Sequence, residues 1–124
     1  MPTIFSMTDW IPIPFTELYD HINRTESELN GELLNFWNLI KVEPKKWSEE
    51  EYGNEGGGFW VVAICGVRVI WFNDIEEGFN ISTYTTLGKL DEYYCNQDEL
   101  RFAILRLFDL VKFGGDLVGN AGKP

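Results

Sequence analysis

The chain has 124 residues, of which 44% are hydrophobic and 15% aromatic, enough for the core of one domain. Twenty acidic residues against ten basic ones give a net charge of −10, which argues against binding to nucleic acid or to anionic membranes. Two cysteines in a chain of this size indicate reduced thiols in a cytoplasmic protein, not a disulfide framework. We expect one domain over residues 1–113, with an extended arm at residues 1–13 and a flexible tail at residues 114–124.

The N-terminal part is expected to contain an arm and two helices. Prolines at positions 12 and 14 restrict the residues before them to extended backbone, and Pro14 suits the first position of a helix. The sequence Thr25-Glu26-Ser27-Glu28 resembles a capping box and predicts the start of a second helix, which should stop before Pro44. The same apolar stripe also allows one long, kinked helix.

The middle of the chain predicts a β-sheet. Residues 44–58 are rich in glycine and acids and are expected to form a surface loop. Two β-branched and aromatic runs between residues 59 and 72 then predict a hairpin that turns at Cys65-Gly66 and is covered on both faces. Residues 79–84 alternate with a period of two and predict a third, half-exposed strand. A short fourth strand is expected around Gly88.

The last element is predicted to be a helix whose apolar face runs from Leu100 to Val111. Asn96 or Asp98 would cap its start, and Gly114-Gly115 would end it. The predicted fold is therefore α+β: N-terminal helices, an antiparallel sheet of three to four strands, and a C-terminal helix packed on the sheet.

Two groups of acids flank the third predicted strand. If the third and fourth strands pair, both groups lie at one end of the sheet, beside aromatic side chains that would serve as anchors for a protein partner. A solvated turn is the alternative interpretation. The spacing of the first group lacks the glycine-punctuated pattern of a calcium loop, so no metal is predicted. The candidate partner-binding residues are Asp74, Glu76, Glu77, Asp91 and Glu92.

The sequence contains no motif typical of catalysis or of cofactor binding. Cys95 precedes the predicted last helix, where the helix dipole lowers the pKa of a thiol, but the one histidine, His21, lies far away in the sequence. Gly56-Gly57-Gly58 precedes a strand and lacks the lysine of a phosphate-binding loop. We therefore predict no catalytic residue and no cofactor, and we leave the reactivity of Cys95 open.

The stretch I-W-F-N-D-I-E-E-G-F-N-I-S through G-K-L-D-E-Y-Y-C-N-Q-D-E-L, within residues 59 to 105, resembles a group of small bacterial proteins of unknown function. Some such acidic α+β proteins are thought to act as immunity proteins of toxin systems. The resemblance implies a cytoplasmic, stoichiometric binder, and it assigns no role to any residue. We predict a non-catalytic protein-binding module that occludes a basic partner, such as a nuclease toxin. The alternatives are a small-ligand-binding protein or enzyme with a carboxylate and aromatic pocket, and a homodimer formed through the sheet.

Overall fold

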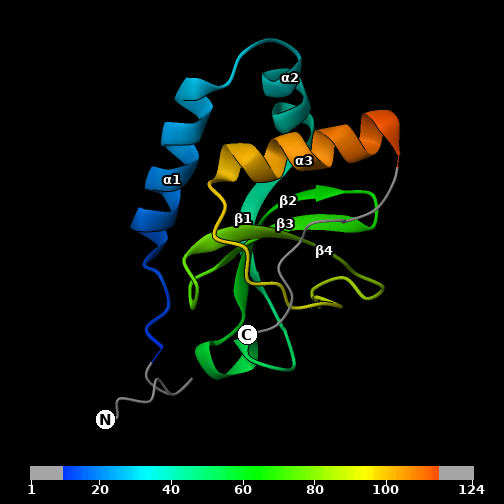
Figure 1. The fold of residues 1–124 in the computed structure, drawn as a ribbon. Coiled ribbons are helices and arrows are strands. Elements are labelled where there is room, and N and C mark those ends of the chain that lie inside the picture. The colour runs from blue at the N-terminus through cyan, green and yellow to red at the C-terminus, as the bar shows by residue number, and fades with distance from the viewer. Residues whose placement is uncertain (1–9, 115–124) are drawn as a thin grey trace.

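The computed structural model describes residues 10–114, which form three α-helices and a four-stranded antiparallel sheet with strand order β1-β2-β3-β4 (Figure 1). The predicted α+β class is confirmed, because the C-terminal helix packs against the sheet. The elements in chain order are α1 (Phe15–Glu28), α2 (Gly31–Ile40), β1 (Lys41–Trp47), the 3-10 helix η2 (Gly53–Gly56), β2 (Phe59–Cys65), β3 (Arg68–Asn73), β4 (Gly78–Thr83) and α3 (Leu100–Phe113).

The two N-terminal helices are separate, but the predicted capping box does not divide them. Residues 25–28 form the last turn of α1, which ends where the amide of Leu29 donates to the carbonyl of Thr25 at 3.1 Å. Thr25 is buried on the same side of α1 as Leu18 and Ile22, so it belongs to the inner face of this helix. The start of α1 directly after Pro14 agrees with the prediction.

The first strand lies partly within the predicted surface loop. β1 pairs with β2 from Lys41 to Trp47, with an irregular register between Lys41 and Lys45. Pro44 lies at this irregularity, where a residue without an N–H is tolerated because the strand is at the edge of the sheet. The rest of the predicted loop contains η2.

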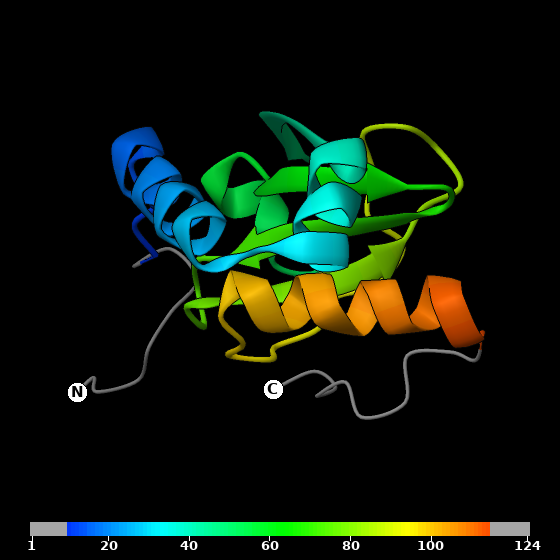
Figure 2. The same ribbon diagram turned by 90° about the horizontal axis from the view of Figure 1, so that it is seen from above.

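The predicted hairpin of β2 and β3 is confirmed, but its turn is at Gly66-Val67, one residue later than the predicted Cys65-Gly66. Neighbouring side chains on β3 point to opposite faces, so that Phe72 packs in the core beneath the helices and Trp71 in a second core on the other face. Figure 2 shows α3 running along the sheet, where its buried residues contribute to the first core. The sheet therefore separates two cores. Among the described residues, the α-helices contribute to the first core and not to the second.

Irregular chain covers the second face, and no strand forms around Gly88. Within residues 84–98, Leu90 and Tyr93 are buried against the second core, and the carbonyl of Asp98 accepts from the amide of Phe79 at 2.8 Å. Because this segment lies over β4, residues 78–82 are all buried and not half-exposed as predicted. The described end of the predicted arm contributes Trp10 to the same core. The predicted tail lies outside the described residues beyond Gly114.

Candidate functional site

The turn between β3 and β4 is shaped by a buried side chain at the end of β3. The amide oxygen of Asn73 accepts hydrogen bonds from the backbone N–H groups of Ile75 at 3.0 Å and Glu76 at 3.1 Å, while its NH2 group donates to the carbonyl of Tyr94 at 2.9 Å. Glu77 then adopts a φ of 58°, a left-handed conformation that costs an L residue roughly 1 kcal/mol. The turn thus holds the backbone of Glu77 in a strained conformation and leaves its side chain exposed.

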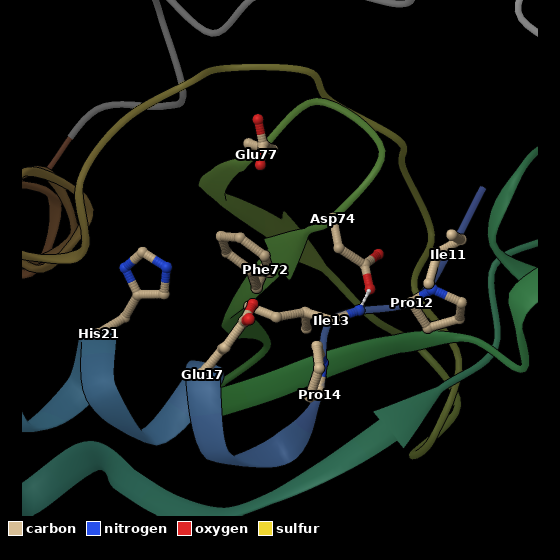
Figure 3. A pocket seen from close by; sticks show the side chains of 9 residues that line it. All are labelled: Ile11, Pro12, Ile13, Pro14, Glu17, His21, Phe72, Asp74 and Glu77. Carbon is tan, nitrogen blue, oxygen red and sulfur yellow. Dashed lines mark hydrogen bonds between the residues drawn. The ribbon is translucent and has the colours of Figure 1, made fainter.

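An open groove of about 400 Å³ lies between this turn, the described arm and α1 (Figure 3). Prolines, isoleucines and a phenylalanine make up its apolar part, and three carboxylates and one imidazole make up its polar part. No lysine or arginine lines it. The lining residues are Ile11, Pro12, Ile13, Pro14, Glu17, His21, Phe72, Asp74 and Glu77.

Asp74 fastens the arm to the turn. One carboxylate oxygen, Oδ2, accepts the backbone N–H of Ile13 at 2.7 Å. Burial raises the pKa of Asp74, and the N–H of Ile13 opposes this rise only in part. The indole N–H of Trp10 also lies near and lowers the pKa of Asp74, although its geometry falls short of a hydrogen bond. The second oxygen, Oδ1, is out of contact with solvent, so a ligand in the groove does not reach it.

The accessible charges of the groove come from its two walls. Glu17 and His21 are four residues apart on α1 and therefore lie on one face of the helix, and the exposed Glu77 lies across from them on the turn (Figure 3). The ring of His21 packs 5.4 Å from the ring of Phe72. Within residues 10–114, neither Glu17 nor Glu77 forms an ion pair. The walls are negative above an apolar floor, which suits a cation with an apolar stem.

The two predicted groups of acids lie at opposite ends of β4, roughly 17 Å apart along a six-residue strand. Asp74 and Glu77 precede Gly78, whereas the carboxylate of Glu92 accepts from the backbone N–H of Thr83 at 2.8 Å and from its hydroxyl at 2.6 Å. The expectation that they share one end is wrong, because no fourth strand carries the chain back before Asp91. Glu92 therefore supports the end of β4, and Asp91 is exposed beside it.

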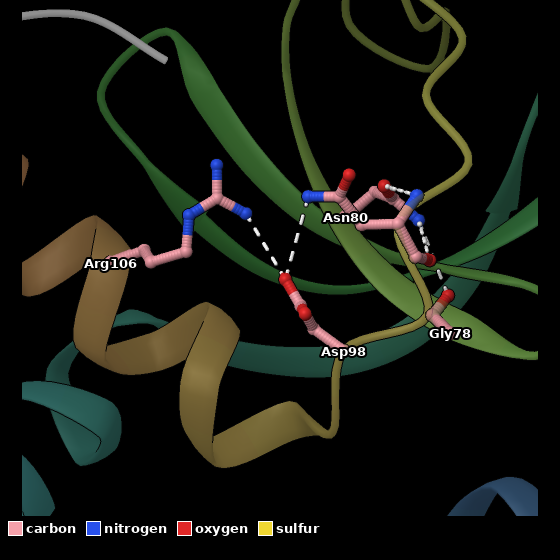
Figure 4. Close-up of polar contacts among 5 residues, drawn as sticks. Gly78, Asn80, Asp98 and Arg106 are labelled. Carbon is pink, nitrogen blue, oxygen red and sulfur yellow. Dashed lines mark hydrogen bonds and ion pairs between the residues drawn. The ribbon is translucent and has the colours of Figure 1, made fainter. Parts of the chain in front are cut away.

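Asn96 and Asp98, the predicted helix caps, instead join residues 84–98, the covering segment of the second face, to β4 and α3 (Figure 4). The side chain of Asn80 accepts the backbone N–H of Asn96 at 2.8 Å and donates to its carbonyl at 3.1 Å, which imitates a strand pairing. Asp98 accepts from Arg106 at 3.2 Å. Neither Asn96 nor Asp98 caps α3, whose N-cap residue is Glu99.

Cys95 is not prepared for nucleophilic catalysis. Burial and the nearby Glu76 raise the pKa of its thiol, and α3 begins only at Leu100. Cys95 packs against the second core, whereas His21 contacts Phe72 on the opposite face of the sheet. The sheet therefore keeps the thiol away from the one histidine. Glu76 also contributes to the rise in the pKa of Tyr93 to about 12, after burial as the main cause.

Residues 10–114 contain no group of three or more histidine, cysteine, aspartate or glutamate side chains placed to hold a metal ion. None of the described helices has the length and apolar character needed to cross a membrane. Comparison of the chain with protein-family models, with curated proteins and with solved structures found no match.

Proposed function

We propose that this chain is a non-catalytic binding protein whose acidic surface engages a basic protein partner, as an immunity protein would occlude a nuclease toxin. The observation that supports this proposal is an excess of exposed carboxylates over the cations able to neutralise them. Each of the five ion pairs among the described residues uses one acid and one base. The described acids that are exposed and form no ion pair are Glu17, Asp20, Glu28, Glu43, Glu55, Glu77, Asp91 and Asp109.

Such a surface accelerates the encounter with a positively charged partner. The field of a strongly charged protein raises the association rate constant by one or more orders of magnitude at low ionic strength, and salt removes this gain. The same field repels nucleic acid, so the acidic protein can compete with a nucleic-acid substrate for the basic surface of a nuclease. Stoichiometric occlusion requires no catalytic group.

The chemistry of the groove supports binding over acid-base catalysis. A general acid must reach its substrate, yet Asp74, the groove carboxyl with a raised pKa, has one oxygen on the N–H of Ile13 and the other out of contact with solvent. Outside the groove, the raised pKa of the Cys95 thiol leaves less of the reactive thiolate than an ordinary cysteine has, which also disfavours catalysis.

Salt-graded capture tests the proposal. The immobilised protein is incubated with extract of its native host at low salt, and bound proteins are eluted with rising salt and identified. We expect a basic protein that leaves between low and high salt and that inhibits growth when it is expressed without this chain. No bound protein at low salt, or a bound protein that is indifferent to salt, would overturn the proposal.

Stopped-flow association with the purified partner then isolates the role of the surface. A variant with amides in place of Glu28, Glu43, Glu55 and Asp109 removes four exposed charges outside the groove. We expect its association rate constant to fall several-fold at low salt, and to equal that of the wild type at high salt.

A second function, binding of a small free cation, is favoured by the same groove, since its volume lies in the range of ligand pockets. Micromolar affinity for a small cation such as agmatine in isothermal titration, with no protein partner captured, would favour this second function over the first.

A further inference from the structure

We infer that the groove between the arm, α1 and the β3–β4 turn receives the guanidinium side chain of one arginine of a protein partner. This inference rests on the proposed function and identifies the part of the surface that recognises the partner. The charge and the shape of the groove, and the number of donors that its carboxylates can accept, all favour this side chain.

Charge excludes an anionic occupant. Glu17 approaches from α1 and Glu77 from the turn, so an occupant between them meets carboxylates from two sides. The lining contains no lysine or arginine to neutralise them. Neither carboxylate forms an ion pair in the described part of the chain, so both remain available for a cation from outside.

Shape favours a long side chain over a bare ion. The apolar surface that is accessible in the groove comes from Pro12, Ile13 and Pro14 of the arm, beside the nearly buried ring of Phe72, so the methylene stem of an arginine would lie on this surface while its head reaches the acids. A planar guanidinium also stacks on rings, as an ammonium does not. Among residues 10–114, no carboxylate cluster suits a metal ion.

Donor number favours arginine over lysine. A guanidinium carries five N–H donors in a rigid fork and can bond two carboxylates that come from different walls, whereas an ammonium acts as a point charge. Glu77 is held at φ 58°, where glycine would be more stable, so the turn keeps a carboxylate there at a conformational cost.

Titration with a blocked amino acid, followed by NMR, tests the groove without any protein partner. The probe is N-acetyl-arginine-N-methylamide, whose single charge is on the side chain. Its matched control is the citrulline analogue, which has nearly the same shape and no charge. The reporters are the ring proton of His21, the one histidine of the chain, and the amide of Ile13. We expect saturable, millimolar binding of the arginine probe, and binding of the citrulline probe that is at least fivefold weaker.

Two variants locate the binding. E17Q/E77Q removes both wall charges without removing a hydrogen bond among the described residues, and we expect it to weaken the arginine probe at least fivefold. E28Q/E43Q removes two exposed charges that do not line the groove, and it should leave the affinity within twofold of the wild type. A two-dimensional amide spectrum of each variant establishes that it is folded.

Equal binding of both probes, unchanged affinity in E17Q/E77Q, or shifts confined to residues outside the groove would each overturn the inference. Because the probes act without a partner, the outcomes separate it from the proposed function. Capture of a basic partner together with an unresponsive groove overturns the inference alone. A responsive groove without any basic partner supports a guanidinium site and overturns the proposed function.

Discussion

Glu77 occupies a backbone conformation that suits glycine, and its carboxylate forms no ion pair among the described residues. We predict that E77G raises the free energy of unfolding by about 1 kcal/mol, because the strain at φ 58° is relieved. Urea unfolding measures the change, and E77Q, which keeps the Cβ and the strain, should differ little from the wild type. A less stable E77G would show that the Glu77 side chain stabilises the fold by more than its backbone conformation costs.

Asp74 gives the stability of the protein a pH dependence of definite sign. Burial raises its pKa in the folded state, so the folded protein holds this proton more tightly than the unfolded chain does. Its contribution is therefore most favourable below the ordinary carboxyl pKa of about 4, and declines as the pH rises through the raised folded value.

The variant D74N isolates this contribution, since its amide oxygen can still accept the N–H of Ile13. We predict that the free energy of unfolding of the wild type, minus that of D74N, falls between pH 4 and pH 7 in urea titrations. Glu28→Gln, at an exposed position, is the matched control. A difference that grows with pH would mean that Ile13 and Trp10 stabilise the carboxylate by more than burial disfavours it.

At the scale of elements, Gly78 determines how closely the covering segment approaches β4. A Cβ at this position would lie 2.3 Å from the carbonyl oxygen of Asn96 and 2.3 Å from the Cα of Gln97, both of which are backbone atoms. We predict that G78A destabilises the protein by about 2 kcal/mol, because backbone must shift to accommodate the methyl group.

The control for Gly78 is G66A in the β2–β3 turn, where φ is 62° and no atom lies within 4 Å of the added Cβ. It should cost only about 1 kcal/mol of backbone strain. Hydrogen exchange then distinguishes the two, since the amide of Asn96 should exchange faster in G78A than in G66A. Equal costs and equal exchange would show that the contact with residues 96–97 is easily released.

Elements with a strong local pattern were predictable, and those decided by tertiary contacts were not. The hairpin of β2 and β3 and the helix α3 have continuous or periodic apolar residues, and the sequence predicts the bounds of both to within a few positions. β1 has only Pro44 and Trp47 buried between lysines, so its pairing with β2 leaves little trace in the sequence. The burial of β4 depends on residues 84–98, which have no regular structure of their own.

The groove was predictable only in part for a related reason. The sequence places Asp74 and Glu77 in the turn after an apolar strand, and their role in binding stays a prediction. Ile13 lies 61 residues away from Asp74, and Glu17 reaches the same groove only through the packing of α1. No local pattern reports contacts of that separation. The prediction for Glu92 is wrong because its carboxylate accepts a hydrogen bond from the backbone N–H of Thr83. The sequence does not distinguish such a structural acid from a solvated one.

At the scale of the whole molecule, the arrangement of the sheet bears on self-association. Both faces are covered, one by helices and one by irregular chain. The edge strand β1 carries Pro44 together with exposed Lys41, Lys45 and Lys46, features that discourage pairing with another strand. At the other edge, the backbone N–H groups at both ends of β4 donate to residues 92 and 98. A net charge of −10 adds repulsion between copies.

We therefore predict that the chain does not dimerise through its sheet. Light scattering at high concentration should give the mass of one chain, 14.4 kDa, at low salt. K45V, which replaces one exposed lysine of β1 by a β-branched residue, should associate more readily because it removes a charge that disfavours strand pairing at this edge. A dimer of the wild type in which the amides of β1 gain protection from hydrogen exchange would contradict the prediction. It would also mean that the acidic surface meets a second copy of itself despite the repulsion.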